Sequence, residues 1–242
     1  MAADLKLRRG ARDLVNDPRR TNSCRSASAL TSAGIGFQRT ELLHERSGAS
    51  MKEKQYLALL RGINVGGNNI ITMTALKACF EKLGLMDVAT YIQSGNVLFR
   101  TAEKDLGRLT NTIEDTLSKQ FSYASRVVVV PHSELTHVVQ RAPKGLGTNP
   151  ARYRYDVVFL KPPLTADHAM KSIRTKTGVD QAFAGKGVLY FSRLIRKASR
   201  SHLTRIIQLP IYQSMTIRNW NTTTKLLALM DARAKNKYRP SD

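Results

Sequence analysis

The chain contains 242 residues, of which 42% are hydrophobic, and carries a formal net charge of +21 from 39 Lys and Arg against 18 Asp and Glu. A chain of this length buries a core without disulfides or metals, which excludes disorder throughout. No stretch approaches the roughly eighteen apolar residues of a membrane span, and two cysteines are too few for a secreted disulfide framework or a Cys-rich zinc site. We therefore expect a cytoplasmic protein that does not associate with membranes and needs neither a metal ion nor a cofactor.

Residues 1–50 form a segment of different composition. They hold a single aromatic residue, Phe37, are rich in Arg and Ser, and show neither helical nor strand periodicity. Such a segment has little to bury, so we expect it to be a disordered leader. The alternative is that translation starts at Met51, directly before the first convincing strand. A transit peptide is disfavoured because the segment contains five acidic residues.

Residues 51–142 predict a first α+β subdomain. Its strands are short apolar runs, and its helices carry apolar residues at helical spacing. The turn Ser94-Gly95-Asn96 predicts a hairpin, because Gly and Asn tolerate a positive φ. The expected elements are a strand at 56–60, a helix at 73–83, strands at 88–93 and 97–100, a helix at 103–121, a strand at 127–130 and a short helix before Pro143.

A connection with two prolines and two glycines, residues 141–152, leads into a second round of elements in residues 143–242. The order strand, helix, hairpin, helix, strand is that of a ferredoxin-like fold, and it occurs twice. We predict an α+β protein of two ferredoxin-like subdomains with antiparallel sheets, followed by a C-terminal helix. The second set is expected as strand 156–160, helix 165–176, strands 179–183 and 188–191, helix 199–208, strand 213–217 and helix 223–235.

A glycine-rich segment follows the first predicted strand, where backbone N–H groups can approach a phosphate. It lacks the spacing of a dinucleotide-binding loop and the lysine of a P-loop. The favoured interpretation is a tight structural turn in which Asn64 makes local hydrogen bonds. The alternative is an anion site formed by Arg61, Asn64, Gly66 and Gly67.

A second polar segment, residues 218–222, lies between the last strand and the last helix. One interpretation makes Asn221 or Thr222 the N-cap of this helix and Trp220 a buried anchor. The other lets Arg218, Asn219 and Trp220 hold a carboxylate or phosphate. If both segments lined a cleft between the subdomains, the protein would be a small-ligand binder or an enzyme. No nucleophile or acid–base pair is evident, so we predict no reaction and leave the catalytic residues unknown.

Three motifs occur in order along the chain: Arg61-Gly62-Ile63-Asn64-Val65-Gly66-Gly67, Thr90-Tyr91-Ile92-Gln93-Ser94-Gly95-Asn96-Val97-Leu98-Phe99 and Arg218-Asn219-Trp220-Asn221-Thr222. With these motifs the chain resembles the bacterial domain of unknown function family 1697 over about residues 54–232. The resemblance implies a small cytoplasmic protein of two ferredoxin-like subdomains without an established activity.

Two thirds of the net charge lies in residues 143–242, which hold 19 basic and 5 acidic side chains. This asymmetry predicts nucleic acid or an anionic small molecule as partner. Tyr190 lies in a partial match to the aromatic signature of RNA-binding sheets, although packing in the core is the favoured interpretation of its ring. The expected nucleic-acid contacts are Arg193, Arg196, Lys197, Arg200 and Arg205.

Overall fold

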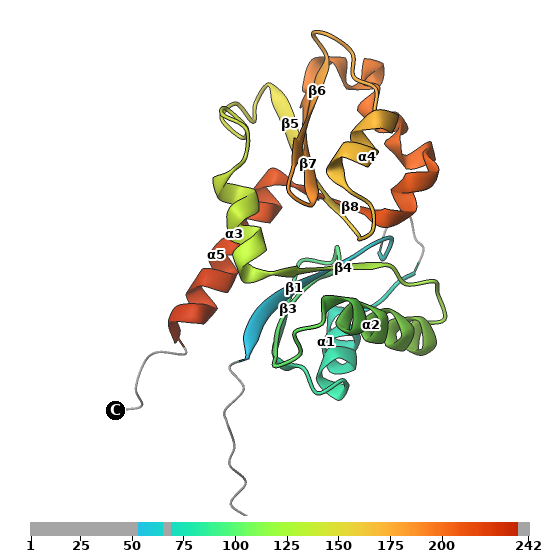
Figure 1. Ribbon diagram of the computed structural model, residues 1–242, viewed down its shortest axis with the longest axis vertical. Helices are drawn as coiled ribbons and strands as arrows, with labels where there is room; N and C mark the ends of the chain where they lie inside the picture. The colour runs from blue at the N-terminus through green and yellow to red at the C-terminus, as the bar shows by residue number, and fades with distance from the viewer. Residues whose placement is uncertain (1–52, 65–68, 237–242) are drawn as a thin grey trace, which may run out of the picture. The chain divides into compact units, whose positions relative to one another are not determined.

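The computed structural model describes residues 53–64 and 69–236 (Figure 1). The predicted leader of residues 1–50, the alternative start at Met51, and the glycines Gly66 and Gly67 lie outside the described residues. Within the described ranges, no helix is both long and apolar enough to cross a membrane.

The described chain consists of two successive sets of strands and helices. The first set is β1 (Lys54–Leu60), α1 (Met73–Lys82), β2 (Met86–Tyr91), β3 (Asn96–Thr101), α2 (Leu106–Phe121), β4 (Val127–Pro131) and α3 (His132–Gln140). The second is β5 (Tyr153–Leu160), α4 (Ala166–Ser172), β6 (Asp180–Gly185), β7 (Val188–Leu194), the 3-10 helices η1 (Ile195–Arg200), η2 (Leu203–Gln208) and η3 (Pro210–Ser214), β8 (Met215–Asn219) and α5 (Trp220–Asn236).

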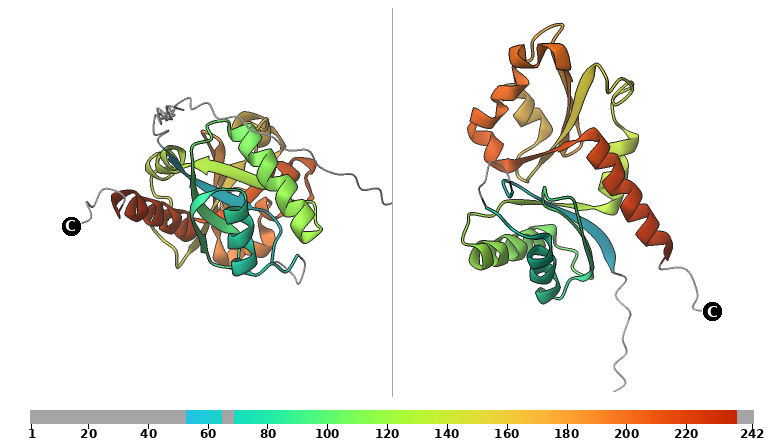
Figure 2. Two further views of the ribbon diagram at one scale, coloured as in Figure 1. Left: turned by 90° about the horizontal axis from the view of Figure 1, so that it is seen from below. Right: turned by 180° about the vertical axis from the view of Figure 1, so that it is seen from behind.

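Each set forms a four-stranded antiparallel sheet with the strand order of a ferredoxin-like fold. The orders are β2-β3-β1-β4 and β6-β7-β5-β8. Helices α1 and α2 pack on one face of the first sheet, and α4 and the 3-10 helices pack on one face of the second (Figure 2). The predicted α+β class with two ferredoxin-like units and a C-terminal helix is thereby confirmed.

The two sheets also repeat each other in backbone hydrogen bonding, which the sequence did not reveal. Arg61 and Lys161 directly follow the central strands β1 and β5. Each donates its backbone N–H to the residue that precedes the neighbouring edge strand. The bonds run from Arg61 to Arg126 O at 2.9 Å and from Lys161 to Ser214 O at 2.8 Å. Arg61 and Lys161 therefore occupy equivalent positions in the two units.

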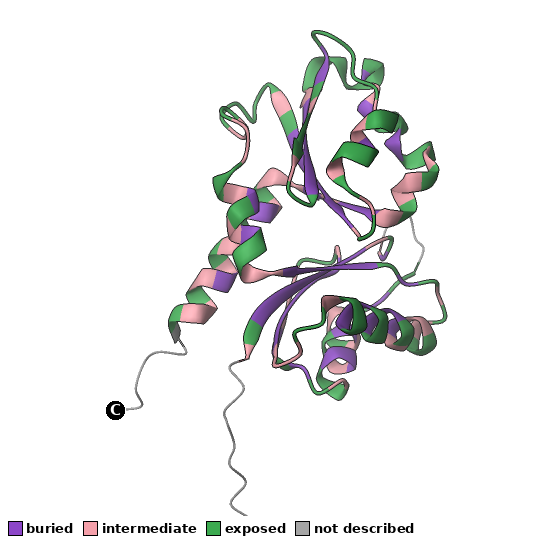
Figure 3. Cartoon of the chain, viewed as in Figure 1, coloured by how far each residue is buried: buried purple, intermediate pink, exposed green. Residues whose placement is uncertain are grey.

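One hydrophobic core lies between the sheets and joins them. Leu57 and Leu59 of β1 and Val157 and Phe159 of β5 belong to a single cluster of buried side chains, to which α3 and α5 also contribute. The opposite faces of the sheets pack on their own helices. Both faces of the central strands are thus covered in both sheets, and Figure 3 shows these strands as mostly buried.

The segment between β7 and β8 differs from the helix predicted at residues 199–208. It forms successive 3-10 helices instead. Leu203 and Ile206 are its buried side chains in η2, and their spacing of three residues suits a 3-10 turn, in which such side chains eclipse. Pro210 then prevents one longer helix, because it has no backbone N–H to donate.

Candidate functional site

The first motif loop, which follows β1, is fastened by the side chain of Asn64. Asn64 has a φ of +52°. Its Nδ2 donates to Ile71 O and to Gln93 O, each at 2.9 Å, and its Oδ1 accepts from the Ile71 N–H at 2.8 Å. Both amide donors of Asn64 are therefore used within the protein, as a tight structural turn requires. Anion binding by Gly66 and Gly67 stays a prediction.

Arg218 of β8 reaches across to the first sheet. Its side chain is buried, and burial lowers its pKa to about 10, so it is still protonated at neutral pH. Among the described residues, its guanidinium donates to uncharged oxygens and to no carboxylate. These acceptors are Asn96 Oδ1 at 2.5 Å, Leu60 O at 2.8 Å, Ser94 O at 2.9 Å, Gly95 O at 3.1 Å, Thr216 Oγ1 at 3.0 Å and Ile217 O at 2.9 Å.

These contacts make Arg218 a link between its own motif, the second motif and the end of β1, which directly precedes the first motif. The end of β1, the Ser94-Gly95-Asn96 turn and β8 meet at its guanidinium. A guanidinium has five N–H donors, and the six acceptors around Arg218 engage all of them. Arg218 therefore has no free donor for a ligand in this arrangement, and we assign it a structural role between the sheets.

Asn219 caps α5, which begins three residues before the predicted start at residue 223. Its Oδ1 accepts the N–H of Asn221 at 2.9 Å, and its Nδ2 donates to Tyr155 O at 3.2 Å. The predicted N-cap at Asn221 or Thr222 is therefore wrong, because Asn219 already supplies the acceptor that the first turn needs. The cause is that β8 runs directly into the helix without an intervening loop.

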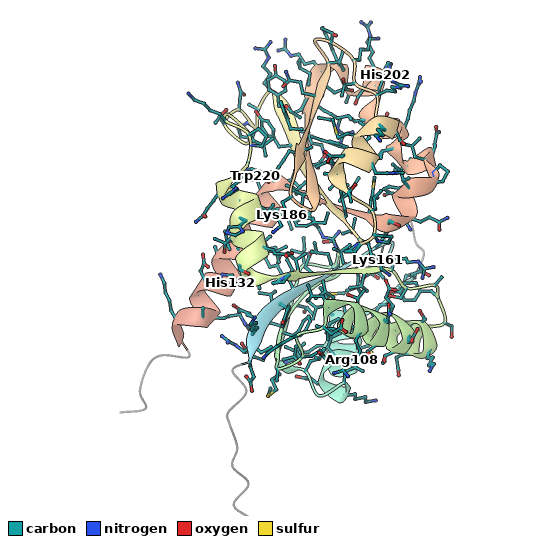
Figure 4. The ribbon with its side chains drawn as sticks, in the orientation of Figure 1. Arg108, His132, Lys161, Lys186, His202 and Trp220 are labelled. Carbon is teal, nitrogen blue, oxygen red and sulfur yellow. The ribbon has the colours of Figure 1, made fainter. Side chains whose placement is uncertain are left out.

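Trp220, labelled in Figure 4, opens α5 and packs at the margin of the core between the sheets. The backbone of Gly147 lies directly on its indole: a Cβ at Gly147 would be 2.3 Å from Trp220 Nε1. Trp220 thus anchors both α5 and the connection between the two units. Ligand contacts by Asn219 and Trp220 stay predictions.

Arg61 lies beside the narrow gap between β4 and β8, which has no room for a water molecule. Its Cζ is 4.5 Å from the centroid of the Tyr212 ring, and among the described residues its buried Nε has no hydrogen-bond partner. Lys161, labelled in Figure 4, lines the same gap and donates to Glu114 Oε1 at 2.7 Å and Oε2 at 2.6 Å. The predicted ligand cleft between the subdomains stays a prediction, and this closed packing does not favour it.

The predicted nucleic-acid contacts lie at one end of the second sheet and in the 3-10 helices beyond it. Arg154 pairs with Arg193 in the sheet register, and Ile195 donates its N–H to Arg152 O at 3.0 Å. The fold therefore adds Arg152 and Arg154 to the predicted set. We call the basic rim the six residues Arg152, Arg154, Arg193, Arg196, Lys197 and Arg200, all exposed except the partly buried Arg193; Arg205 is exposed on η2.

The buried carboxylate of Asp156 holds two residues of the basic rim in place. Its Oδ2 accepts from Arg193 Nη2 at 2.7 Å, and both of its oxygens lie 3.2 Å from Arg154 Nε. The side chain of Arg193 is therefore mostly buried in its ion pair with Asp156, whereas most of the Arg154 side chain lies in solvent. Arg152 and Arg154 were not predicted as contacts, although they alternate around Tyr153 at the start of a strand.

A second buried carboxylate, Asp180, anchors the segment after η1. It accepts from Ser201 Oγ at 2.6 Å, from the Lys176 N–H at 2.5 Å and from the His202 N–H at 2.8 Å. Burial by itself raises the pKa of Asp180, but these hydrogen bonds and one from Leu203 outweigh it and lower the pKa. The sequence around Asp180 gives no sign of this role, because its hydrogen-bond partners are distant from each other in the chain. Lys176 precedes β6, whereas Ser201 and His202 follow η1.

Asp180→Asn is expected to lower the free energy of unfolding at neutral pH by roughly 1–2 kcal/mol, because an amide cannot accept all of these hydrogen bonds. The folded pKa lies below the ordinary value of 3.8, so the ionised carboxylate stabilises the fold above that pH. The difference between wild type and variant should shrink as the pH falls below 3.8 through the folded pKa. Urea unfolding over an acid pH series measures it, and a pH-independent difference would contradict this assignment.

The aromatic residues of β7 belong to the core. Tyr190 and Phe191 are each only 2% exposed. Tyr190 donates its hydroxyl to Val138 O at 2.8 Å, and burial raises its pKa to about 12. Tyr190 faces the core between the sheets, and Phe191 faces α4 and the 3-10 helices. Neither ring is available for stacking on a base, in agreement with the favoured interpretation.

Two ferredoxin-like units that share one core, with the buried side chain of Arg218 linking their sheets, define the class: an α+β protein with a duplicated fold. A family model described as "Protein of unknown function (DUF1697)" matches residues 53–190, and the chain belongs to this family. This confirms the family to which its motifs pointed.

The fold is similar to that of a solved structure, described as the conserved bacterial protein SP0830 from Streptococcus pneumoniae. The two share 24% sequence identity, with a TM-score of 0.66, over 74% of this chain and 99% of that chain. At this identity the likeness concerns the fold. The curated proteins contain no match to the chain.

Proposed function

We propose that the protein binds nucleic acid through the basic rim, by contacts to the phosphate backbone. The supporting observation is that two separate stretches of cations, residues 152–154 and 193–200, meet at one end of the second sheet. Several exposed Arg and Lys side chains on adjoining segments can neutralise successive phosphates. The two acids of this end, Asp156 and Asp180, are buried and hydrogen-bonded within the protein.

The covered sheets decide the expected mode of binding. Base recognition on a ferredoxin-like sheet uses exposed aromatic rings on its central strands, and here those strands are buried on both faces. The remaining contacts are cations on the phosphate backbone, which carry little sequence information. We therefore expect binding that is insensitive to sequence and strongly weakened by salt.

The test is charge reversal of three exposed residues of η1: Arg196→Glu, Lys197→Glu and Arg200→Glu combined. The affinity for a short labelled DNA duplex or single-stranded RNA at low salt should fall by at least roughly tenfold, and the dependence of log affinity on log salt should flatten by roughly two to three. Fluorescence anisotropy over a salt series measures both quantities.

A variant with the same change in net charge serves as control: Lys77→Glu, Lys104→Glu and Lys119→Glu, all exposed in the first unit. It should retain most of the affinity if the rim is the contact surface. Equal loss in both variants would show that only the overall charge matters. That result, or wild-type protein that does not bind at low salt, overturns the proposal.

A further inference from the structure

Among the four edges of the two sheets, β6 is the regular edge that the described residues leave open. β4 and β8 face each other across the closed gap described above. The β2 edge is irregular, with a register shift after Met86 and a φ of +52° at Asp87, whose carbonyl also accepts from Arg233. β6 instead pairs with β7 in unbroken register from Asp180 to Gly185 and is the outermost strand of its sheet.

The register identifies the groups of β6 that point outward. Val179 O accepts from the Leu194 N–H of β7 at 2.9 Å, whereas the Asp180 N–H donates away from the sheet, to Lys176 O at 3.0 Å. Because the direction alternates along an antiparallel strand, Ala182 and Ala184 also direct their N–H and C=O groups outward. No other described residue bonds to these groups. They form a short ladder with which an extended chain can pair.

Side-chain sites exist on both sides of this ladder. On one face the ring of Phe183 is 38% exposed and offers an apolar contact. On the other face an open pocket of about 600 Å³ is lined by residues 162–167 and 184–187. Successive side chains of an added strand would point alternately to Phe183 and to this pocket.

The charges around the edge favour an acidic occupant. The exposed charged side chains of residues 166–187 are four cations and one acid: Lys171, Arg174, Lys176, Lys186 and Asp167. A second copy of the chain would bring the same four cations against themselves, in a protein whose net charge is already +21. An acidic strand would be attracted instead.

We infer that β6 binds an extended acidic segment of a partner protein as a fifth strand of the second sheet. Backbone hydrogen bonds to Ala182 and Ala184 hold the segment, and the flanking cations select its acidic side chains. Ala182 and Ala184 are not among the residues proposed to contact nucleic acid.

The probe is a labelled synthetic peptide of alternating valine and glutamate, titrated by fluorescence anisotropy against the full chain. Ala184→Pro removes one outward N–H but leaves the ladder to β7 intact, and should weaken binding by roughly tenfold or more. Ala184→Val keeps the N–H at the same position and should bind like wild type. Equal binding by the proline variant, or no binding by wild type, overturns the inference.

Two further peptides keep the test independent of variant folding. One is methylated on every second backbone nitrogen and cannot donate to the strand; the other replaces glutamate with lysine. Both should bind the wild-type chain more weakly than the Val/Glu peptide, and equal binding of either overturns the inference. So does a dimer of the chain alone, seen by sedimentation, that Ala184→Pro dissociates, because the occupant would then be a second copy.

Discussion

Arg218→Ala is expected to lower the free energy of unfolding by roughly 3–5 kcal/mol. The substitution removes the Arg218 donors to Asn96 Oδ1 and to the carbonyl oxygens of Leu60, Ser94 and Gly95, of which Gly95 O keeps a second hydrogen bond, from the Leu60 N–H. These oxygens lie between two packed sheets, where an acceptor without a hydrogen bond is costly. Urea unfolding followed by circular dichroism at neutral pH measures the loss.

Two variants separate the geometry of Arg218 from its charge. Arg218→Lys keeps the charge but has one donor nitrogen where the guanidinium has three, so it should also destabilise strongly. Arg196→Ala removes an exposed arginine and should change stability by no more than about 0.5 kcal/mol. If Arg218→Ala were as stable as Arg196→Ala, Arg218 would not be the link between the sheets.

Gly147→Ala is expected to lower the free energy of unfolding by roughly 2–4 kcal/mol. Gly147 has a φ of +84°, and its new Cβ would lie 2.3 Å from Nε1 and 2.5 Å from Cδ1 of Trp220. The indole is rigid, so the connection or the start of α5 has to move. Because Trp220 is the single tryptophan of the chain, a shift of its fluorescence emission in the folded protein reports that movement directly.

Gly145→Ala is the matched control for this prediction. Gly145 has nearly the same φ, +85°, but its new Cβ would approach Thr148 Oγ1 no closer than 4.0 Å. Gly145→Ala should therefore lower the free energy of unfolding only by the roughly 1–2 kcal/mol that a positive φ costs an alanine. The tryptophan emission should stay unchanged. Equal effects of the two alanines on stability and emission would show that Trp220 does not rest on Gly147.

Much of the fold could be predicted because its signals are local. The apolar run before Arg61 and the Ser94-Gly95-Asn96 turn each indicate their structure within a few residues. The 3-10 helices after β7 have a non-local cause beside the local ones: Asp180 accepts hydrogen bonds from the N–H of His202 and the hydroxyl of Ser201 across more than twenty residues. The spacing of apolar residues within a segment cannot show that a distant carboxylate binds the backbone of that segment.

The candidate sites stay predictions, and the structure shows only how their side chains are placed. Arg218 and Asn64 stood out because polar residues in loops are typical of binding sites. The structure instead surrounds Arg218 with protein oxygens, among them a carbonyl 158 residues away. The exposed cations Arg196, Lys197 and Arg200 were found from charge alone, because a dense run of basic residues has too few local acids to pair with.

By itself the sequence determined the class of each strand and most helices, the twofold order of elements and the concentration of charge in the second unit. Periodicity and composition are properties of neighbouring residues, so these features needed no tertiary information. Only the tertiary structure decided that the sheets bury their faces against each other, that Arg218 bonds to the end of β1 and to the Ser94-Gly95-Asn96 turn, and that most of the basic rim and the outer edge of β6 are exposed. The physical reason is that alternation shows that a side chain is buried but not what buries it, and the partners of a polar group depend on register and packing between distant strands.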